Sequence, residues 1–261
     1  MADRSREPAP VLVTNGDGRS PFVILCDHAS NYIPAAYGDL GLSDAERTSH
    51  IAWDPGALAV SKRLSIALNA PLVQSTVSRL MIDCNRSLDA SNLFWTLSEA
   101  TRIAANEGLD QAEKALRIDR YYRPYHAAVT ALIDARVKAR QETVLVCMHS
   151  FTPVYNGVAR PWAAGLIHGG DAAFARGVFD SLCAKREGLV IGWNEPYSAV
   201  DGVTFTLEHH GDVRGLPAVM VEIRNDEIQT AEGEANWARK LTYALEEARK
   251  RSKRAGAGGE R

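Results

Sequence analysis

The sequence predicts an α/β fold, a single domain with a mixed, largely parallel sheet flanked by helices. Short apolar runs alternate with helical stretches along the 261 residues, which is the pattern of α/β proteins. No linker, composition shift or internal repeat divides the middle of the chain. We therefore expect one domain over residues 21–251, preceded by a flexible arm (1–20) and followed by a disordered, basic tail (252–261).

Composition excludes several classes of protein. Thirty Lys and Arg residues balance 32 Asp and Glu residues, and this net charge of −2 gives no footprint for nucleic acid. No apolar run approaches the ~20 residues of a membrane span, and the N-terminus lacks the apolar stretch of a signal peptide. The four cysteines lack a CxxC spacing, which favours reduced thiols. We expect a cytoplasmic protein with no nucleic acid or membrane partner, and its function must be sought in local chemistry.

Continuous apolar runs without helical periodicity predict the strands. The clearest is 143–148 (TVLVCM), and the first, 21–26 (PFVILC), has the same character. In chain order, the predicted strands are 21–26, 71–77, 80–82, 143–148, 164–167, 189–192, 204–207 and 218–223.

Capping and breaking signals predict the helices. A capping box over 43–46 opens a short helix, and a Pro-Gly pair precedes a helix over 57–68. A long helical region over 110–138 is expected to break or kink at Pro124, because proline removes a backbone donor and clashes with the preceding turn. Two further helices are predicted at 172–185 and 231–251.

Polar residues lie at the ends of four predicted strands. In open α/β sheets, ligands bind outside the carboxyl ends of the strands, so these clusters would meet if their strands are neighbours. The clusters are Asp27-His28, Asp83-Asn85-Arg86, His149-Ser150 and Glu222-Arg224-Asn225-Asp226. We expect the functional site at this edge of the sheet.

His28 and His149 each follow a predicted strand directly. Metal sites in hydrolases combine imidazole nitrogens with a carboxylate and leave one position for water. The alternative is that each histidine merely caps a strand end through a hydrogen bond. Because the two histidines occupy matching positions after their strands, metal binding and strand capping are about equally well supported.

Glu222 projects from the face opposite its apolar neighbours on a short strand. A buried carboxylate is costly unless it is paired or functional. It could pair with Arg224, which lies on the same face at period two, or act as a general base beside a metal-bound water.

Other polar residues have both a functional and a structural interpretation. Arg79, Asn85 and Arg86 carry donors suited to a substrate carboxylate, and surface salt bridges are the alternative. Asp54, before a Pro-Gly pair, is also a good helix N-cap. The pair at 209–210 could lie on the surface or in a mobile active-site loop, and the helical position of His126 favours a structural role. The sequence has no GxSxG elbow, phosphate-binding loop or dinucleotide fingerprint.

Seven motifs, taken together and in order, resemble the N-formylglutamate amidohydrolase family, whose fold is related to that of the zinc carboxypeptidases. The resemblance covers roughly residues 20–250. The matching stretches are 26–34 (CDHASNYIP), 50–57 (HIAWDPGA), 78–86 (SRLMIDCNR), 122–126 (YRPYH), 148–151 (MHSF), 194–198 (NEPYS) and 221–226 (VEIRND).

This resemblance implies a zinc-dependent hydrolase, with one Zn²⁺ ion, that cleaves an amide next to a carboxylate. His28 and His149 look like two of the metal ligands. The carboxypeptidase-like pattern has Glu three residues after the first histidine, but this sequence has Asn31 there. We expect Asp54 to supply the acidic ligand, with Asn31 or His50 as weaker options.

The resemblance also implies roles around the ligand. Glu222 looks like the catalytic glutamate, and Arg79 could stabilise the oxyanion. Asn85 and Arg86 look like the pair that holds the substrate carboxylate. At the level of the family alone, Arg123 and Tyr197 are candidates for further contacts to an acidic substrate.

Three other functions compete with a deformylase or a related N-acyl amino acid deacylase. The same motifs would serve a metallocarboxypeptidase-like peptidase, or a non-catalytic α/β binding relative that has lost its metal. A serine hydrolase using Ser150 has only the adjacent His149 in its favour. Neighbouring residues on a strand point to opposite faces, which places that pair poorly.

Overall fold

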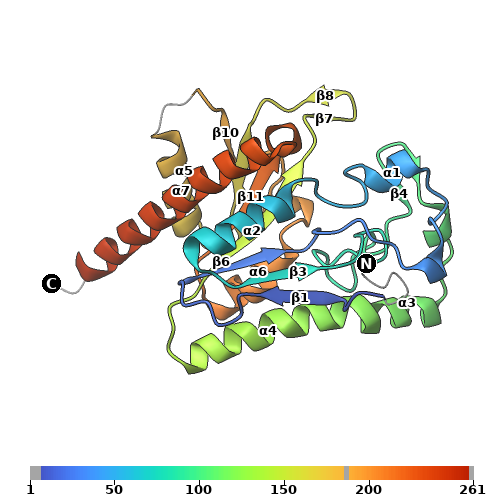
Figure 1. Cartoon of the computed structure of the whole chain (residues 1–261), viewed down its shortest axis with the longest axis horizontal. Coiled ribbons are helices and arrows are strands. Elements are labelled where there is room, and N and C mark those ends of the chain that lie inside the picture. Colours follow the sequence, from blue (N-terminus) through green and yellow to red (C-terminus); the bar gives the residue numbers. More distant parts are fainter. Residues whose placement is uncertain (1–6, 185–187, 259–261) are drawn as a thin grey trace.

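A computed structural model describes residues 7–184 and 188–258 and has the predicted architecture, a mixed α/β domain (Figure 1). One seven-stranded sheet has the order β1-β3-β2-β6-β11-β9-β10. The strands are β1 (Val11–Thr14), β2 (Phe22–Cys26), β3 (Leu72–Ser75), β6 (Val144–Phe151), β9 (Ala164–Ile167), β10 (Ile191–Trp193) and β11 (Ala218–Arg224). Strands β3, β2, β6 and β11 are mutually parallel, whereas β1 and β9 join this group antiparallel.

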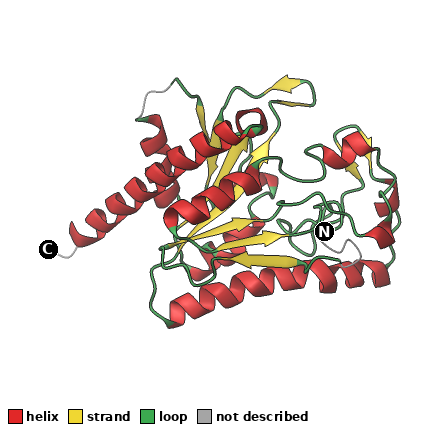
Figure 2. Ribbon diagram, viewed as in Figure 1, coloured by secondary structure: helices red, strands yellow, loops and turns green. Residues whose placement is uncertain are grey.

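Helices cover both faces of the sheet (Figure 2). On one face lie α2 (Ala57–Leu68), α5 (Ala173–Cys183) and α7 (Ala231–Gly258), and on the other lie α4 (Arg123–Lys138) and α6 (Phe205–His210). Side chains of β2 alternate between the two cores: Ile24 belongs to the core that contains Trp237 of α7, and Leu25 belongs to the core that contains Tyr125 of α4. Because both faces are buried, the central strands are continuous apolar runs rather than alternating ones.

Several short elements lie outside the seven-stranded sheet. Two small hairpins, β4–β5 and β7–β8, belong to this group (Figure 1). The elements are α1 (Asp44–Thr48), β4 (Leu97–Ser98), β5 (Thr101–Arg102), α3 (Gln111–Arg117), a π-helical turn (Ile118–Tyr122), β7 (Val154–Tyr155), β8 (Val158–Ala159), and 3₁₀ turns at Ala35–Tyr37, Ala104–Asn106, Ala199–Asp201, Asp212–Arg214 and Asn225–Ile228. The capping box at Ser43 and Glu46 opens α1 as predicted.

The predicted break near Pro124 takes the form of a π-helical turn. Residues 118–122 adopt this wider turn between α3 and α4, and Pro124 then lies in the first turn of α4. The helix runs on through this turn, because the Arg123 amide donates to the Ile118 carbonyl, and the wider turn stands directly before the residue that has no N–H to donate.

The structure differs from the sequence-based expectation at four places. Residues 11–14, expected within a flexible arm, form the edge strand β1 against β3. Residues 80–82 lie in a turn, in which the amide of Met81 donates to the carbonyl of Ser78. We expect a strand over residues 204–207, but α6 begins at Phe205. The Glu208 amide donates to the Thr204 carbonyl and the Gly211 amide donates to the Leu207 carbonyl, which is the hydrogen bonding of a helix. Helix α7 continues through 252–258, expected to be part of the tail; residues 259–261 lie outside the described chain.

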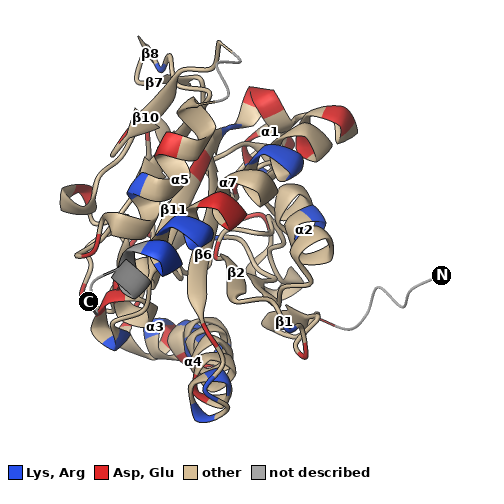
Figure 3. Cartoon of the chain, turned by 90° about the vertical axis from the view of Figure 1, so that its left-hand side faces the viewer, with Lys and Arg blue, Asp and Glu red and all other residues tan. Residues whose placement is uncertain are grey.

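Charged residues are dispersed over the molecule. Figure 3 shows Lys and Arg positions mixed with Asp and Glu positions along the helices. Within the described ranges, no helix is both long and apolar enough to cross a membrane.

Candidate metal centre and substrate pocket

Three residues of the metal-ligand type converge at the carboxyl ends of the central strands. His149 lies in β6, and His28 lies two residues beyond β2, its parallel neighbour. Asp54 lies in the turn before α2, where its amide donates to the carbonyl of His28 over 2.9 Å. The turn depends on Gly56, which has φ +81° and whose Cβ, if present, would meet the Ile228 carbonyl oxygen at 2.6 Å. A side chain there would push this turn away from the histidines.

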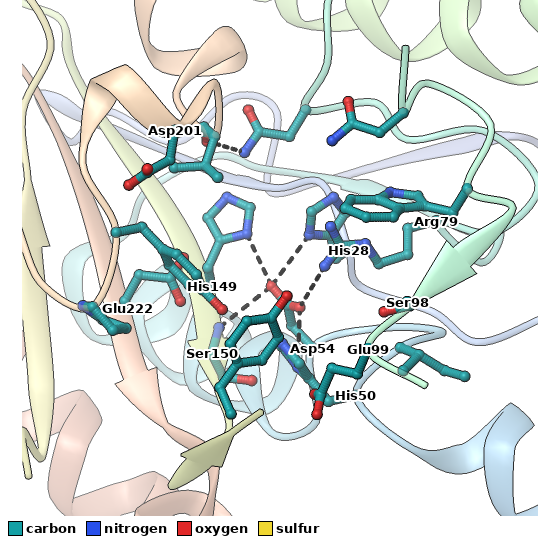
Figure 4. A pocket seen from close by; sticks show the side chains of 18 of the residues that line it. His28, His50, Asp54, Arg79, Ser98, Glu99, His149, Ser150, Asp201 and Glu222 are labelled. Atoms are coloured by element: carbon teal, nitrogen blue, oxygen red, sulfur yellow. Dashed lines mark hydrogen bonds and ion pairs between the residues drawn. The ribbon is translucent and has the colours of Figure 1, made fainter. Parts of the chain in front are cut away.

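Both imidazoles direct Nδ1 toward the same carboxylate oxygen (Figure 4). Asp54 Oδ2 lies 2.9 Å from His149 Nδ1 and 3.3 Å from His28 Nδ1. One ligand atom from each of the three residues can be chosen so that all lie within 4.8 Å of one another, and all three side chains are buried. Two imidazole nitrogens and one carboxylate are the protein ligands of many catalytic zinc sites.

The outer nitrogens of both rings face further carboxylates. His28 Nε2 donates to Asp83 Oδ1 over 2.7 Å, and His149 Nε2 lies 3.2 Å from Asp27 Oδ2. Histidines that bind metals commonly contact a carboxylate through the other nitrogen, which fixes the ring orientation. Asp27 and Asp83 thus contact the two rings on the side away from Asp54; both residues lie in the sequence motifs, but nothing in the motifs points to these contacts.

The carboxylates govern the charge of this centre. Burial opposes protonation of His149, but Asp27 and Asp54 outweigh it and raise the pKa of His149 well above its usual value. Burial and Arg79 also disfavour the charged form of His28, yet Asp83 and Asp54 raise its pKa. In turn, the histidines hold the pKa of the buried Asp54 well below its usual range. The site therefore attracts cations, and a proton and a metal ion compete for the same nitrogens.

The donor set fits a metal ion. Asp54 Oδ1 and Glu222 Oε2 are buried and have no hydrogen-bond partner within the described chain, although buried oxygens are nearly always paired. His50 Nδ1 lies 3.5 Å from Asp54 Oδ1, and burial lowers the pKa of His50 to about 4. Asn31 is directed elsewhere, since its amide donates to the carbonyl of Arg47 over 2.9 Å. Asp54, rather than Asn31, thus stands between the two histidines.

Glu222 is the direct neighbour of His149 in the sheet. The register of β11 on β6 pairs the two residues, and the Glu222 side chain is buried in the pocket. Burial raises the pKa of Glu222 to about 7, although His149 opposes that shift. The alternative partner, Arg224, instead donates to Asp226 over 2.7 Å and to Glu227 over 3.4 Å. Glu222 is therefore a buried carboxylate with no structural ion pair to Arg224.

A pocket of about 420 Å³ opens in front of the centre and includes three arginines. Arg79 Nη2 donates to Asp83 over 2.9 Å, and Arg79 Nη1 lies 3.7 Å from Asp54. Arg86 and Arg160 are both buried. The sequence motifs identified Arg79 and Arg86 but not Arg160, which lies outside them in the loop after β8.

Two other predicted substrate-binding residues line this pocket, but a third does not. Tyr197 lines it and accepts a hydrogen bond from Arg160 over 3.1 Å. Asn85 also lines it, but its amide is bonded to the segment before and within α6: it accepts from the Thr206 amide and donates to the Val203 carbonyl. Arg123 lies outside the pocket, with an exposed side chain paired to Asp119 on the preceding turn.

Ser150 is oriented for a structural contact. Its Oγ donates to the Pro55 carbonyl over 2.9 Å, and its amide donates to Asp54. The hydroxyl therefore holds the Asp54 turn, and no hydrogen bond links it to His149 in the described chain.

A second pair of buried histidines lies on the α4 side of the sheet. His126 Nδ1 lies 2.9 Å from His210 Nε2, and His126 Nε2 donates to the Cys84 carbonyl over 3.0 Å. Burial lowers the pKa of His126 to about 4 and that of His210 to about 3. The structural role expected for His126 fits these contacts. His210 lies buried within α6, in neither of the two settings considered for it.

Comparisons with known proteins place the chain among hydrolases. A sequence model of the N-formylglutamate amidohydrolase family matches residues 20–229. The crystal structure of gene product Atu2144 from Agrobacterium tumefaciens is similar, with a TM-score of 0.92 and 39% identity over 94% of this chain and 97% of that one. An N-formylglutamate amidohydrolase from Ralstonia eutropha JMP134 has the same fold, with a TM-score of 0.68 and 22% identity over 93% and 98%. The chain matches no curated protein.

Proposed function

Because the chain belongs to the N-formylglutamate amidohydrolase family, we propose that it hydrolyses the N-formyl or N-acyl amide of an acidic amino acid such as N-formylglutamate. The observation that carries this proposal is the buried centre of His28, Asp54 and His149 beside Glu222, a buried carboxylate whose Oε2 has no hydrogen-bond partner within the described residues.

His28, His149 and Asp54 would hold one Zn²⁺ ion through Nδ1, Nδ1 and a carboxylate oxygen. When bound, such an ion lowers the pKa of water toward 7 and polarises the amide oxygen. Asp83 and Asp27 orient the two rings from behind, so that Nδ1 of each ring faces the centre.

Glu222 acts as the general base. Its carboxylate takes a proton from the attacking water, whose oxygen bonds to the formyl carbon, and then delivers a proton to the amide nitrogen as the C–N bond breaks. The products are formate and the free amino acid. A pKa near 7 suits a group that must accept and return a proton at neutral pH.

Two positively charged arginines contact the negatively charged groups of the substrate and of the transition state. Arg79 is held by Asp83 and Asp54, and we place it beside the oxyanion that forms on the acyl oxygen. Arg86 binds the α-carboxylate of the substrate, and Asn85 shapes this wall by holding the segment before α6.

The proposal is tested by formate release from N-formyl-L-glutamate and by metal content of the purified protein. We expect one zinc ion per chain, and Glu222→Gln should keep that ion while it loses about 10²- to 10⁴-fold in kcat. Absence of both zinc and formate release from the wild-type protein would reject the proposal and favour a non-catalytic relative. Wild-type turnover in the Gln variant would show that Glu222 is not the base.

A further inference from the structure

The pocket contains two buried guanidinium groups that form no ion pair with the acidic residues of the described chain. Arg86 is 5% exposed and Arg160 is 8% exposed, and neither forms an ion pair with Asp or Glu in the described chain. Arg79, in contrast, is paired with two aspartates. Burying a charge without a counter-ion is costly, so an unpaired buried arginine that lines a pocket indicates an anionic ligand.

Each of the two arginines is held rigidly by neutral groups. The Arg160 guanidinium lies 4.5 Å from the ring centre of Tyr155 and 4.8 Å from that of Tyr197, and it donates to the Tyr197 hydroxyl. Arg86 donates to the Asn85 carbonyl over 2.8 Å and lies 5.6 Å from the ring of Trp95, while its Nε has no partner within the described residues. Stacking orients a guanidinium without neutralising it, which leaves its charge for a ligand.

The two arginines reach the pocket from different parts of the chain. Arg86 lies in the loop after β3, and Arg160 lies at the base of the β7–β8 hairpin, where its amide donates to the Pro153 carbonyl over 2.8 Å. Glu99 and Asp201 also line the pocket (Figure 4), but both are exposed. Asp201 accepts a hydrogen bond from the Ser198 amide. The pocket therefore offers a ligand two buried positive groups, Arg86 and Arg160.

We propose that Arg160 binds the side-chain carboxylate of the substrate, while Arg86 binds its α-carboxylate, so that the pocket selects N-acyl derivatives of dicarboxylic amino acids. This inference rests on the proposed function and assigns its specificity to one residue. A guanidinium fork matches a carboxylate in a bidentate manner, whereas a side-chain amide offers no negative charge to it.

The test compares N-formyl-L-glutamate with N-formyl-L-glutamine, an analogue of nearly the same shape whose side chain is uncharged. We expect the wild-type protein to favour the diacid by about 100-fold in kcat/KM, because a buried charge pair is lost with the amide. Arg160→Gln should abolish this preference, because KM for the diacid should rise far more than KM for the amide. Arg123→Gln, the exposed arginine outside the pocket, should keep the preference.

Calorimetry with glutarate and pentanoate gives a readout without turnover. Glutarate should bind the wild-type protein more tightly than pentanoate does, and Arg160→Gln should remove the difference. If the variant still prefers the diacid in both assays, the inference is wrong, although the proposed function stands. If the wild-type protein hydrolyses neither substrate, the proposed function fails, and glutarate binding alone then decides for or against Arg160.

Discussion

Two pairs of buried histidines lie in one domain and have opposite properties. In the pair His28 and His149, every ring nitrogen faces a carboxylate. In the pair His126 and His210, the rings face each other, and the remaining bonded nitrogen donates to a backbone carbonyl. The pKa is raised in the first pair and lowered in the second. Burial is common to both, so the surrounding carboxylates decide whether a buried imidazole serves a cation.

The largest difference between the two pairs is expected when one ring is removed from each. His149→Ala should lose the bound metal and about 10³-fold or more in turnover, because several kcal/mol of transition-state stabilisation depend on the ion. His210→Phe should keep one metal ion per chain, since His210 lies outside the centre. Metal analysis of both variants, with thermal melting as the check of folding, measures the contrast. Metal loss in both would mean that the two pairs are not functionally separate.

A smaller effect is expected when a carboxylate that faces Nε2 of one of the histidines is changed. Asp27→Asn leaves the shape of the side chain but removes the charge behind His149, and it should weaken zinc affinity about 10- to 100-fold. Competition with a chelator of known affinity measures the effect. Asp134→Asn, a change at an exposed partner of Arg214, is the matched control and should leave the affinity unaltered. Equal affinities for all three proteins would contradict the role given to Asp27.

The smallest expected effect is on acid stability. Because the pKa values of His126 and His210 are lowered on folding, the native state binds fewer protons than the unfolded state below about pH 6.5. Their contribution is present above that pH and declines as the pH falls toward 4, by about 1 kcal/mol per ring at pH 5.5. Urea unfolding should therefore show a shallower loss between pH 7 and 5.5 in His210→Phe than in the wild type. In the wild type, NMR signals of both rings should not titrate above pH 5.5.

Local signals in the sequence predicted most of the fold and the centre of the site. The runs at 21–26 and 143–148 are readable because strands buried on both faces must be apolar throughout. Once the strands were placed, His28, His149 and Glu222 followed, because parallel neighbours end at the same edge. The choice of Asp54 as the acidic residue came from a motif, and the structure brings it to the two histidines.

Features that depend on distant packing were missed or misplaced. The strand expected over 204–207 is helical, since Thr206 is fixed by Asn85, which lies 121 residues earlier. Arg123 was selected from a motif, yet its helix turns it to the surface. Arg160 carries no local signal at all, because only the folded hairpin and the later Tyr197 give its charge a place in the pocket.

The antiparallel join between β11 and β9 has a consequence for how such a protein can diversify. Strand β11 is the last of the parallel group, and it carries Glu222. Beyond β11 in the sheet lie β9 and β10, and what this side adds to the pocket lies on loops, including the segment at Tyr197. The backbone of this segment passes so close to β9 that only a glycine fits at Gly165. Loops tolerate exchange far better than strands do. Mutation of the β7–β8 hairpin can therefore change substrate choice while His149 and Glu222, which lie on the sheet, stay as they are.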